Sequence, residues 1–198
     1  MNTKRSIILR MAAAQGMVRP RDLQAEGIAA AYLQRLAEQG ALVRVARGVY
    51  MLPAAEISEH RSLAEAAKRF PRGVVCLLSA LRFHELGTES PTQVWLALPK
   101  DVQAPRAPGL PLRLVHFSEA GMKVGVESHL VEGVKVQITS KARTLVDCFR
   151  FRHKIGLETA LEALRAGLRE GVLPTEIRRM AEAFRQARIM RPYLEALL

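Results

Sequence analysis

The sequence predicts an α+β protein: a small helical N-terminal domain ending in a β-ribbon, then a larger α+β domain with a helical tail. Early in the chain, helical spacing of apolar residues is followed by the alternating segment GALVRVARGVYML at residues 40–52. In the middle of the chain, strand patterns dominate. From Ser140 onward the periodicity is helical again, so the second domain has its strands first and its helices last.

Residues 1–53 divide into three helices and a two-stranded ribbon. Apolar spacing predicts a first helix that ends at Gly16, and RDLQAEG predicts a short second helix. A third helix is expected over residues 28–39, with Leu33 and Leu36 facing inward. This order of elements is typical of a winged helix-turn-helix. In the ribbon, four residues are expected to pack on the helices: Val43, Val45, Val49 and Met51.

Residues 59–198 are expected to form the second domain, after a linker at residues 54–58 in which Ile57 is the only strong apolar residue. EHRSLAEAAKRF predicts a helix, and VVCLLSALRFHELG predicts a buried run that passes into a short helix. QVWLALP and LRLVHF predict strands, and a hairpin should turn at Glu132-Gly133. Further helices are expected at residues 140–153, 157–170 and 174–188, with a short one after Pro192.

The composition favours a nucleic-acid partner in a reducing, cytoplasmic setting. A net charge of +11 and a pI near 10.5 favour a polyanion, because each neutralised phosphate releases counterions. Residues 1–58 carry 8 Lys/Arg against 4 Asp/Glu and residues 59–198 carry 22 against 15, so charge alone does not choose between the halves. Cys76 and Cys148 lie in apolar runs, which indicates buried thiols. No segment approaches the ~18 apolar residues of a membrane span.

Candidate DNA-binding residues lie on the third helix, on the ribbon and near helix ends. If Leu33 and Leu36 face inward, then Gln34 and Arg35 face outward, and these residue types pair with adenine and guanine edges in the major groove. The expected phosphate contacts are Arg44 and Arg47 of the ribbon, with Lys4, Arg5, Arg19 and Arg21. The alternative is that Gln34 and Arg35 form only a solvated face, but the helix order, ribbon and charge together favour DNA binding.

A second candidate surface lies within ITSKARTLVDCFRFRHK at residues 138–154. Ser140 is placed to cap a helix here, and Arg143 and Asp147 are spaced to pair across one turn. On an exposed face such a pair contributes about 0.3–0.5 kcal/mol. The face would either bind an acidic protein or nucleic acid, or support the domain's own loops. Its residues are Lys141, Arg143, Asp147, Arg150 and Lys154.

The sequence predicts no enzyme, no metal site and no cofactor. It contains no Walker A loop, no HExxH, no CxxC and no Gly-x-Ser-x-Gly elbow. Adjacent residues point away from one another on a helix, so His84 and Glu85 are not an acid–base pair, and His84 is expected at a helix end or in the core. Cys148 is expected to be a small buried residue, and Trp95 a core residue.

Three blocks resemble the AbiEi antitoxins of type IV, or abortive-infection, toxin–antitoxin systems. They are YLQRLAEQGALVRVARGVYMLP, CLLSALRFHELGTESPTQVWLALP and GVKVQITSKARTLVDCFRFRHK, and they follow the family's order over nearly the whole chain. The resemblance implies a winged helix-turn-helix that binds inverted repeats in its own promoter as an autorepressor. It also implies a C-terminal antitoxin domain that neutralises a nucleotidyltransferase-like toxin, without a stable complex being required.

The resemblance leads us to expect double-stranded DNA and a cognate toxin as partners, no membrane, and a monomer that binds operator half-sites. The alternative is a stand-alone winged-helix regulator whose second domain senses a ligand or mediates assembly. The third helix is rich in alanine at its start, which limits direct base readout from that end.

Overall fold

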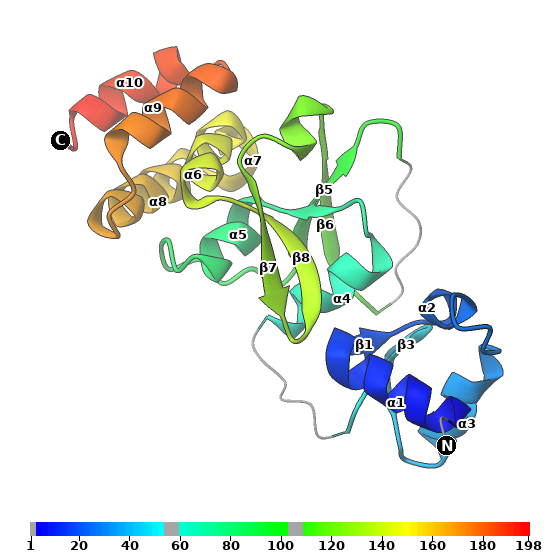
Figure 1. Cartoon of the computed structure of the whole chain (residues 1–198). Helices are drawn as coiled ribbons and strands as arrows, with labels where there is room; N and C mark the ends of the chain where they lie inside the picture. Colours follow the sequence, from blue (N-terminus) through cyan, green and yellow to red (C-terminus); the bar gives the residue numbers. More distant parts are fainter. Residues whose placement is uncertain (1–2, 54–59, 103–108) are drawn as a thin grey trace. The chain divides into compact units, whose positions relative to one another are not determined.

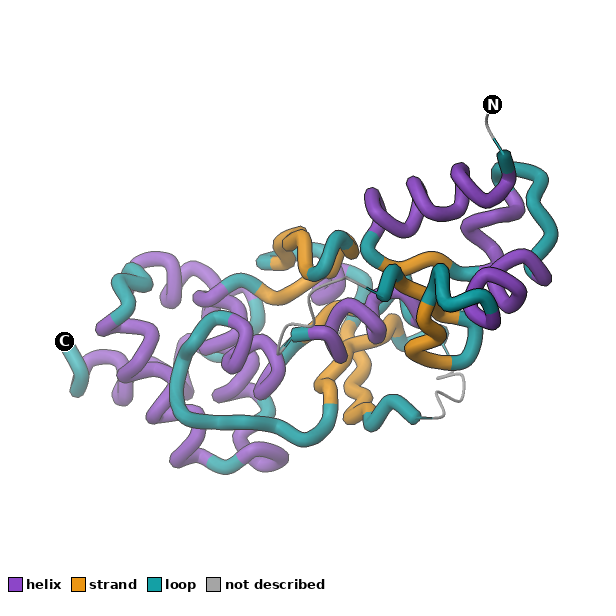
Figure 2. Tube along the Cα trace, turned by 90° about the horizontal axis from the view of Figure 1, so that it is seen from below, coloured by secondary structure: helices purple, strands orange, loops and turns teal. Residues whose placement is uncertain are grey.

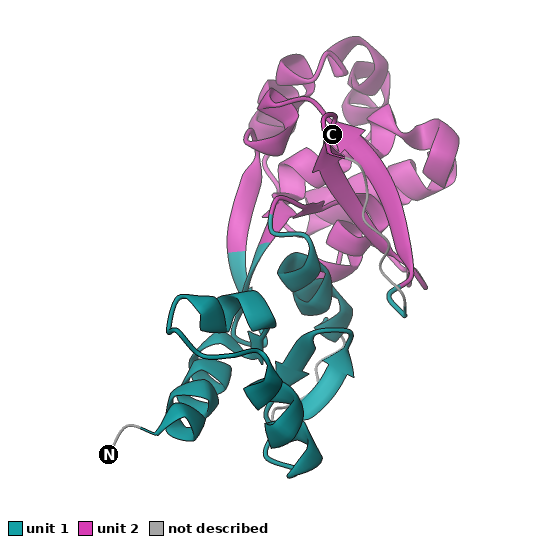
Figure 3. Cartoon of the chain, turned by 90° about the vertical axis from the view of Figure 1, so that its right-hand side faces the viewer, with its two compact units in different colours: residues 1–71, 106–110, 129–136 teal, residues 72–105, 111–128, 137–198 magenta. Residues whose placement is uncertain are grey.

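The computed structural model describes residues 3–53, 60–102 and 109–198, which form two compact units (Figures 1 and 3). The first unit runs from the N-terminus to Pro71 and includes the described residues within 106–110 and 129–136. The second unit contains the described remainder. The fold is mixed α+β, as predicted, with a three-stranded sheet near the N-terminus, a five-stranded sheet and a helical tail.

The first unit begins with a helix-turn-helix. Thr3 caps its first helix by accepting a hydrogen bond from the Ser6 N–H, and Gly16, with a φ of +66°, ends it. The two following helices are short and are joined by a turn in which Gly27 has a φ of +63°. The elements are α1 (Lys4–Gln15), β1 (Met17–Val18), α2 (Pro20–Gln24), α3 (Ala31–Glu38), β2 (Val43–Ala46) and β3 (Val49–Met51).

The small sheet has three strands in the order β1-β3-β2 and not the two that were predicted. β1 pairs Met17 with Met51, but a strand of two residues is too short to produce an alternating pattern in the sequence. The side chain of Val43 was expected to pack on the helices and is instead 45% exposed. It lies on the edge strand β2, whose register shifts between Arg44 and Ala46, so β2 does not share the buried face of β3.

A single apolar core holds the helix-turn-helix together. Leu33 and Leu36 of α3 are buried in it, as predicted. Its buried members are Ile8, Ala12, Val18, Leu23, Ile28, Leu33, Leu36, Leu42 and Tyr50.

Two later segments of the chain join the first unit. One is α4 (Arg61–Arg69), from which the Lys68 ammonium lies 3.2 Å from Gln15 Oε1 and 3.6 Å from Asp22 Oδ2. The other is the turn at Glu132-Gly133, which lies so close to Gly16 that a Cβ added to Gly16 would overlap the Glu132 carbonyl. The predicted linker at residues 54–58 lies outside the described residues, and the predicted domain limits stay a prediction.

The second unit is built around a mixed sheet in the order β6-β5-β4-β8-β7, except that the ends of β7 and β8 within residues 129–136 belong to the first unit. β5 and β6 are parallel over their full length, and β4 is antiparallel to β5 but parallel to β8. The predicted strands and hairpin are present. The elements are β4 (Val74–Val75), α5 (Leu77–Phe83), β5 (Val94–Pro99), β6 (Leu112–Phe117), the 3-10 helix η1 (Ala120–Met122), β7 (Val126–Val131) and β8 (Val134–Thr139). Residues 103–108, between β5 and β6, lie outside the described part.

The helical tail comprises α6 (Lys141–Arg150), α7 (Arg152–Ile155), α8 (Leu157–Arg169), α9 (Pro174–Ala183) and α10 (Ala187–Glu195) (Figure 2). The last helix was expected to start after Pro192, which instead lies inside α10. The break between α9 and α10 falls at Arg185, whose φ is +56°, and the Gln186 N–H closes the turn on the Ala181 carbonyl at 2.7 Å. No sequence pattern indicates that an arginine will adopt a positive φ. The break between α9 and α10 was therefore not predicted.

α6 is the central helix of the second unit, and α5, α8 and α9 pack against it. Trp95, Cys76 and Cys148 are buried in the surrounding core, as predicted. His84 is also buried at the end of α5, and its Nε2 lies 2.7 Å from the Thr139 carbonyl, so it is the structural histidine that was expected. No helix in the described part of the chain is both long and apolar enough to cross a membrane.

Candidate DNA-binding surface

The outward face of α3 forms the centre of the candidate surface. Because Leu33 and Leu36 are fixed in the core, the helix turns Gln34, Arg35 and Glu38 toward solvent, and all three are exposed. No side chain caps the start of α3, where Ala30 precedes its first residue. The exposed orientation predicted for Gln34 and Arg35 is therefore confirmed.

The two polar side chains expected to contact DNA are each held within the first unit. The Gln34 amide donates to Glu38 Oε1 at 3.1 Å, one turn along the same helix. The Arg35 guanidinium lies over the Tyr32 ring, 4.3 Å from its centroid, and the Lys4 ammonium lies 5.4 Å from the same centroid. Tyr32 was not identified from the sequence, although an aromatic residue three positions before an arginine on a helix is the signal that could have found it.

The wing is a short hairpin whose turn is Arg47-Gly48, between β2 and β3. Gly48 adopts a φ of +70°, which a tight turn requires and glycine supplies without strain. A Cβ at Gly48 would lie 3.7 Å from Pro20 Cδ, so this turn sits beside the start of α2. Arg47 is exposed at the tip, and Arg44 is exposed on β2, where its Nε is 3.4 Å from the Ala46 carbonyl.

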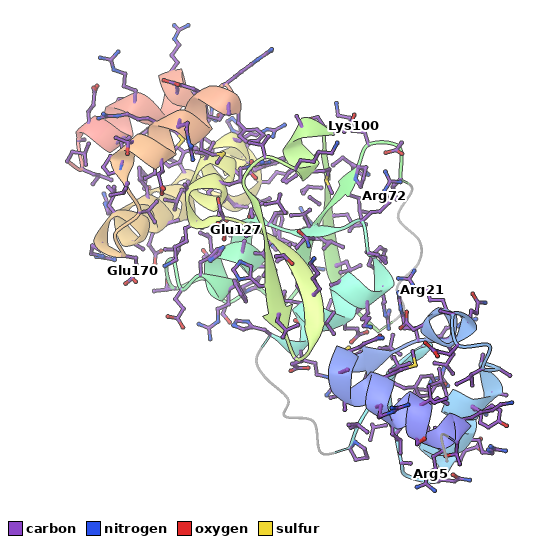
Figure 4. The ribbon with its side chains drawn as sticks, in the orientation of Figure 1. Arg5, Arg21, Arg72, Lys100, Glu127 and Glu170 are labelled. Atoms are coloured by element: carbon purple, nitrogen blue, oxygen red, sulfur yellow. The ribbon has the colours of Figure 1, made fainter. Side chains whose placement is uncertain are left out.

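The remaining predicted phosphate contacts differ in accessibility. Arg19, expected to face DNA, is buried: its side chain is 10% exposed and its Nε lies 3.9 Å from Asp22 Oδ2. The prediction for Arg19 is wrong because the Asp22 carboxylate holds the residue at the start of α2. This carboxylate also accepts a hydrogen bond from the Arg19 backbone N–H at 2.8 Å. The Arg21 side chain is 50% exposed. Lys4 and Arg5 are exposed as well, and Figure 4 shows Arg5 and Arg21 well apart within the unit.

The second candidate surface is largely not a surface. Ser140 caps α6, and Arg143 pairs with Asp147 as the spacing predicts, with Nε 2.8 Å from Oδ2, but both side chains are 0% exposed. The Arg143 Nη1 donates to the carbonyls of Val124, at 2.5 Å, and Gly121, at 3.3 Å. The prediction that this pair faces solvent is therefore wrong.

The physical reason is that other segments cover the polar face of α6. Phe184, which follows α9, places its ring centroid 3.5 Å from the Arg143 guanidinium carbon, and Phe117 lies 4.9 Å away. Burial raises the pKa of Asp147 to about 6, although the neighbouring Arg143 opposes the change. Of the other residues predicted for this surface, Lys141 and Arg150 are half-exposed and Lys154 is exposed.

The described residues contain no group of three or more His, Cys, Asp or Glu side chains placed to hold a metal ion. Burial raises the pKa of the Cys76 and Cys148 thiols well above their ordinary value, so neither is a reactive thiolate near neutral pH. The candidate surface on α3 and the wing offers cations and an amide, from Arg35, Arg44, Arg47 and Gln34.

The N-terminal part of the chain matches a known family, and the fold matches a solved structure. Residues 6–53 match the model of the family described as "Transcriptional regulator, AbiEi antitoxin", so this part of the chain is a domain of that family. The fold is similar to that in the crystal structure of the RV2827C protein from Mycobacterium tuberculosis, with a TM-score of 0.61 and 14% sequence identity over 94% of this chain and 75% of that one. At that identity the likeness shows the fold alone. No curated protein matches the sequence.

Proposed function

We propose that this chain, whose residues 6–53 form a domain of the AbiEi antitoxin family of transcriptional regulators, represses its own promoter and counteracts a cognate toxin. The observation that carries the first part is the coincidence of the family match with an exposed α3 face and an arginine-tipped wing. The function proposed is binding and not catalysis.

In this proposal α3 enters the major groove of an inverted repeat in the promoter, and the wing follows the adjacent backbone. Arg47 at the wing tip reaches phosphate or the minor groove, and Arg44 contacts the backbone beside it. The Gln34 amide uses one N–H for Glu38, and its second N–H and its carbonyl oxygen are the groups left for a base edge. Since most of the affinity then comes from phosphate contacts, binding weakens steeply with salt.

The second part of the proposal concerns a nucleotidyltransferase-like toxin, which residues 59–198 neutralise with or without a stable complex. Support comes from the sequence resemblance that spans both units. Of the five residues expected on the α6 surface, Arg143 and Asp147 are buried. The proposed contact surface for the toxin therefore consists of Lys141, Arg150 and Lys154. An acidic face on the toxin would match these cations.

DNA binding is tested by titrating the full-length protein onto DNA from upstream of its own gene, at fixed salt, with fluorescence anisotropy. We expect Arg47→Ala to weaken binding by about 1–3 kcal/mol, the range for a direct DNA contact. Arg178→Ala is the matched control, since it removes one exposed arginine from α9 in the second unit. Equal affinity of wild type and Arg47→Ala would remove the wing from the interface.

Neutralisation is tested by expressing the full-length protein together with the product of the adjacent gene and measuring growth. The triple variant Lys141→Glu, Arg150→Gln and Lys154→Glu is expected to lose protection while still binding DNA; Arg150 is changed to glutamine because its Nη1 lies 3.9 Å from the buried Asp147 carboxylate, which a glutamate would repel. Full protection by this variant would refute the assigned surface.

A second candidate function is a stand-alone transcriptional regulator. It is favoured by one observation, namely that the family match, to a transcriptional regulator, covers residues 6–53, which form the helix-turn-helix and the wing. Operator binding without any protection of growth by the wild-type protein would select this alternative.

A further inference from the structure

Two cations from different helices meet at one aromatic ring in the first unit. Arg35 on α3 lies 4.3 Å, and Lys4 at the start of α1 lies 5.4 Å, from the Tyr32 ring centroid. The ring itself is anchored, because Tyr32 is half-buried and packs against the core that holds Leu33 and Leu36. The fold therefore holds two exposed cationic side chains near one fixed point.

These cations lack the acidic partners that neutralise other cations of the unit. Lys68 lies 3.6 Å from Asp22, and Arg69 lies 2.7 Å from Glu65. Lys4 and Arg35 have no carboxylate partner in the part of the chain that the structure describes. Like charges that converge without a counter-ion produce a local potential that attracts an anion.

The conformation of Arg35 indicates which kind of anion. An arginine that reads guanine must extend away from its helix so that both terminal nitrogens reach the base edge. Arg35 instead lies back over the ring of Tyr32, the residue three positions earlier on its own helix. A guanidinium held over a ring still has N–H groups at its edge that the ring does not accept from, and that edge suits a pair of phosphate oxygens.

We propose that Lys4, Tyr32 and Arg35 form a phosphate clamp, in which both cations grip the DNA backbone and Tyr32 positions Arg35. The proposal rests on the DNA binding proposed above and deepens it, because it moves Arg35 from base readout to backbone contact. Sequence selectivity then comes from other residues of the surface.

The experiment measures binding of the full-length protein to two duplexes of equal length, its own upstream DNA and a scrambled sequence, over a range of salt concentrations. The variants are Lys4→Ala, Arg35→Ala, Tyr32→Phe, Tyr32→Leu and the double variant Tyr32→Leu/Arg35→Ala, with Arg178→Ala as the control. Thermal melting of each variant checks that the fold is kept.

The clamp predicts that Lys4→Ala and Arg35→Ala each lower affinity about five- to tenfold, by the same factor on both duplexes. Each should also reduce the slope of log affinity against log salt by about 1. Tyr32→Phe keeps the ring and should bind like wild type. Tyr32→Leu should lose about three- to fivefold on both duplexes, and it should cost little more when Arg35 is already alanine, because the ring acts through that side chain.

A tenfold or larger loss in Arg35→Ala on the upstream DNA alone would overturn the clamp and restore Arg35 as a base reader. Additive losses from Tyr32→Leu and Arg35→Ala would overturn the positioning role of the ring. Equal wild-type affinity for the two duplexes would instead refute the proposed repressor while the uniform losses still supported the clamp. Binding of neither duplex by the wild-type protein would refute both.

Discussion

Replacing Arg143 by methionine removes one partner of the buried ion pair in the second unit. Methionine keeps a long unbranched side chain between Phe184 and Phe117 but has no charge and no N–H donors. The variant loses the 2.8 Å contact with Asp147 and the donated bonds to the Val124 and Gly121 carbonyls. It also leaves the Asp147 carboxylate, at 0% exposure, with only the more distant Arg150, whose Nη1 lies 3.9 Å from Oδ1.

The expected cost follows from that burial. Breaking a buried pair by removing one partner costs about 3–5 kcal/mol, against about 0.3–0.5 kcal/mol for an exposed pair of the same spacing. For a domain of this size the loss lowers the melting temperature by about 6–20 °C. Chemical denaturation of the full-length protein at pH 8, followed by circular dichroism, measures the free energy directly.

The pH dependence provides a second check. Burial already raises the pKa of Asp147 to about 6, above its ordinary value of 3.8, and loss of Arg143 raises it further. A carboxyl with a raised folded-state pKa binds more protons in the native state than in the unfolded one. The stability that this group contributes is therefore present at low pH and is lost as pH rises through the folded-state pKa, so the deficit of Arg143→Met should shrink between pH 8 and pH 5.

The double variant Arg143→Met/Asp147→Leu tests whether the cost of the single variant comes from the unpaired charge that it leaves buried. It removes both charges, so it should recover most of the stability that the single variant loses. A single-variant cost below about 1 kcal/mol, or a double variant no more stable than the single, would refute the argument from burial.

Three further predictions follow from close packing, capping and burial in the second unit. Gly125→Ala should destabilise the unit strongly, because Gly125 has a φ of +66° and a Cβ there would lie 2.8 Å from Met180 and 2.9 Å from Arg143. A melting temperature of this variant equal to that of the wild type would contradict the prediction. Ser140→Ala should cost about 1 kcal/mol, because its Oγ caps α6 by accepting from the Arg143 N–H, while Ser140→Asp, which keeps an acceptor, should be tolerated. Cys76 and Cys148, each 0% exposed, should react with a thiol reagent such as DTNB only after unfolding, and rapid labelling of the native protein would show the burial to be wrong.

The sequence was sufficient where local pattern decides the structure. Helical spacing identified Leu33 and Leu36 as the buried side of α3, and alternation identified β5, β6 and the hairpin of β7 and β8. The Arg143–Asp147 pair was also identified, because four-residue spacing on a helix is a local property. Its burial was not, because that depends on Phe184 and on the carbonyls of residues 121 and 124, whose packing over α6 has no local signal.

For the candidate DNA surface, the sequence identified which residues are exposed but not how their side chains are held. Gln34 and Arg35 face solvent as expected, yet the bond to Glu38 and the stacking on Tyr32 depend on rotamers that spacing alone leaves open. Arg19 was misplaced for a related reason: whether an arginine extends or folds inward depends on a neighbouring carboxylate, here Asp22.

The close approach of Gly16 and Gly133 has a consequence for how the protein is made. A Cβ at Gly133 would lie 2.7 Å from the Gly16 nitrogen, so two backbone segments far apart in the sequence fit against each other without any side chain between them. During synthesis the helix-turn-helix leaves the ribosome well before the turn that completes its unit. Contacts of such long sequence separation form late and slow folding. The apolar core of the helix-turn-helix lies within residues 8–50 and can form early, whereas the contact between Gly16 and Gly133 can form only after about two thirds of the protein has been translated.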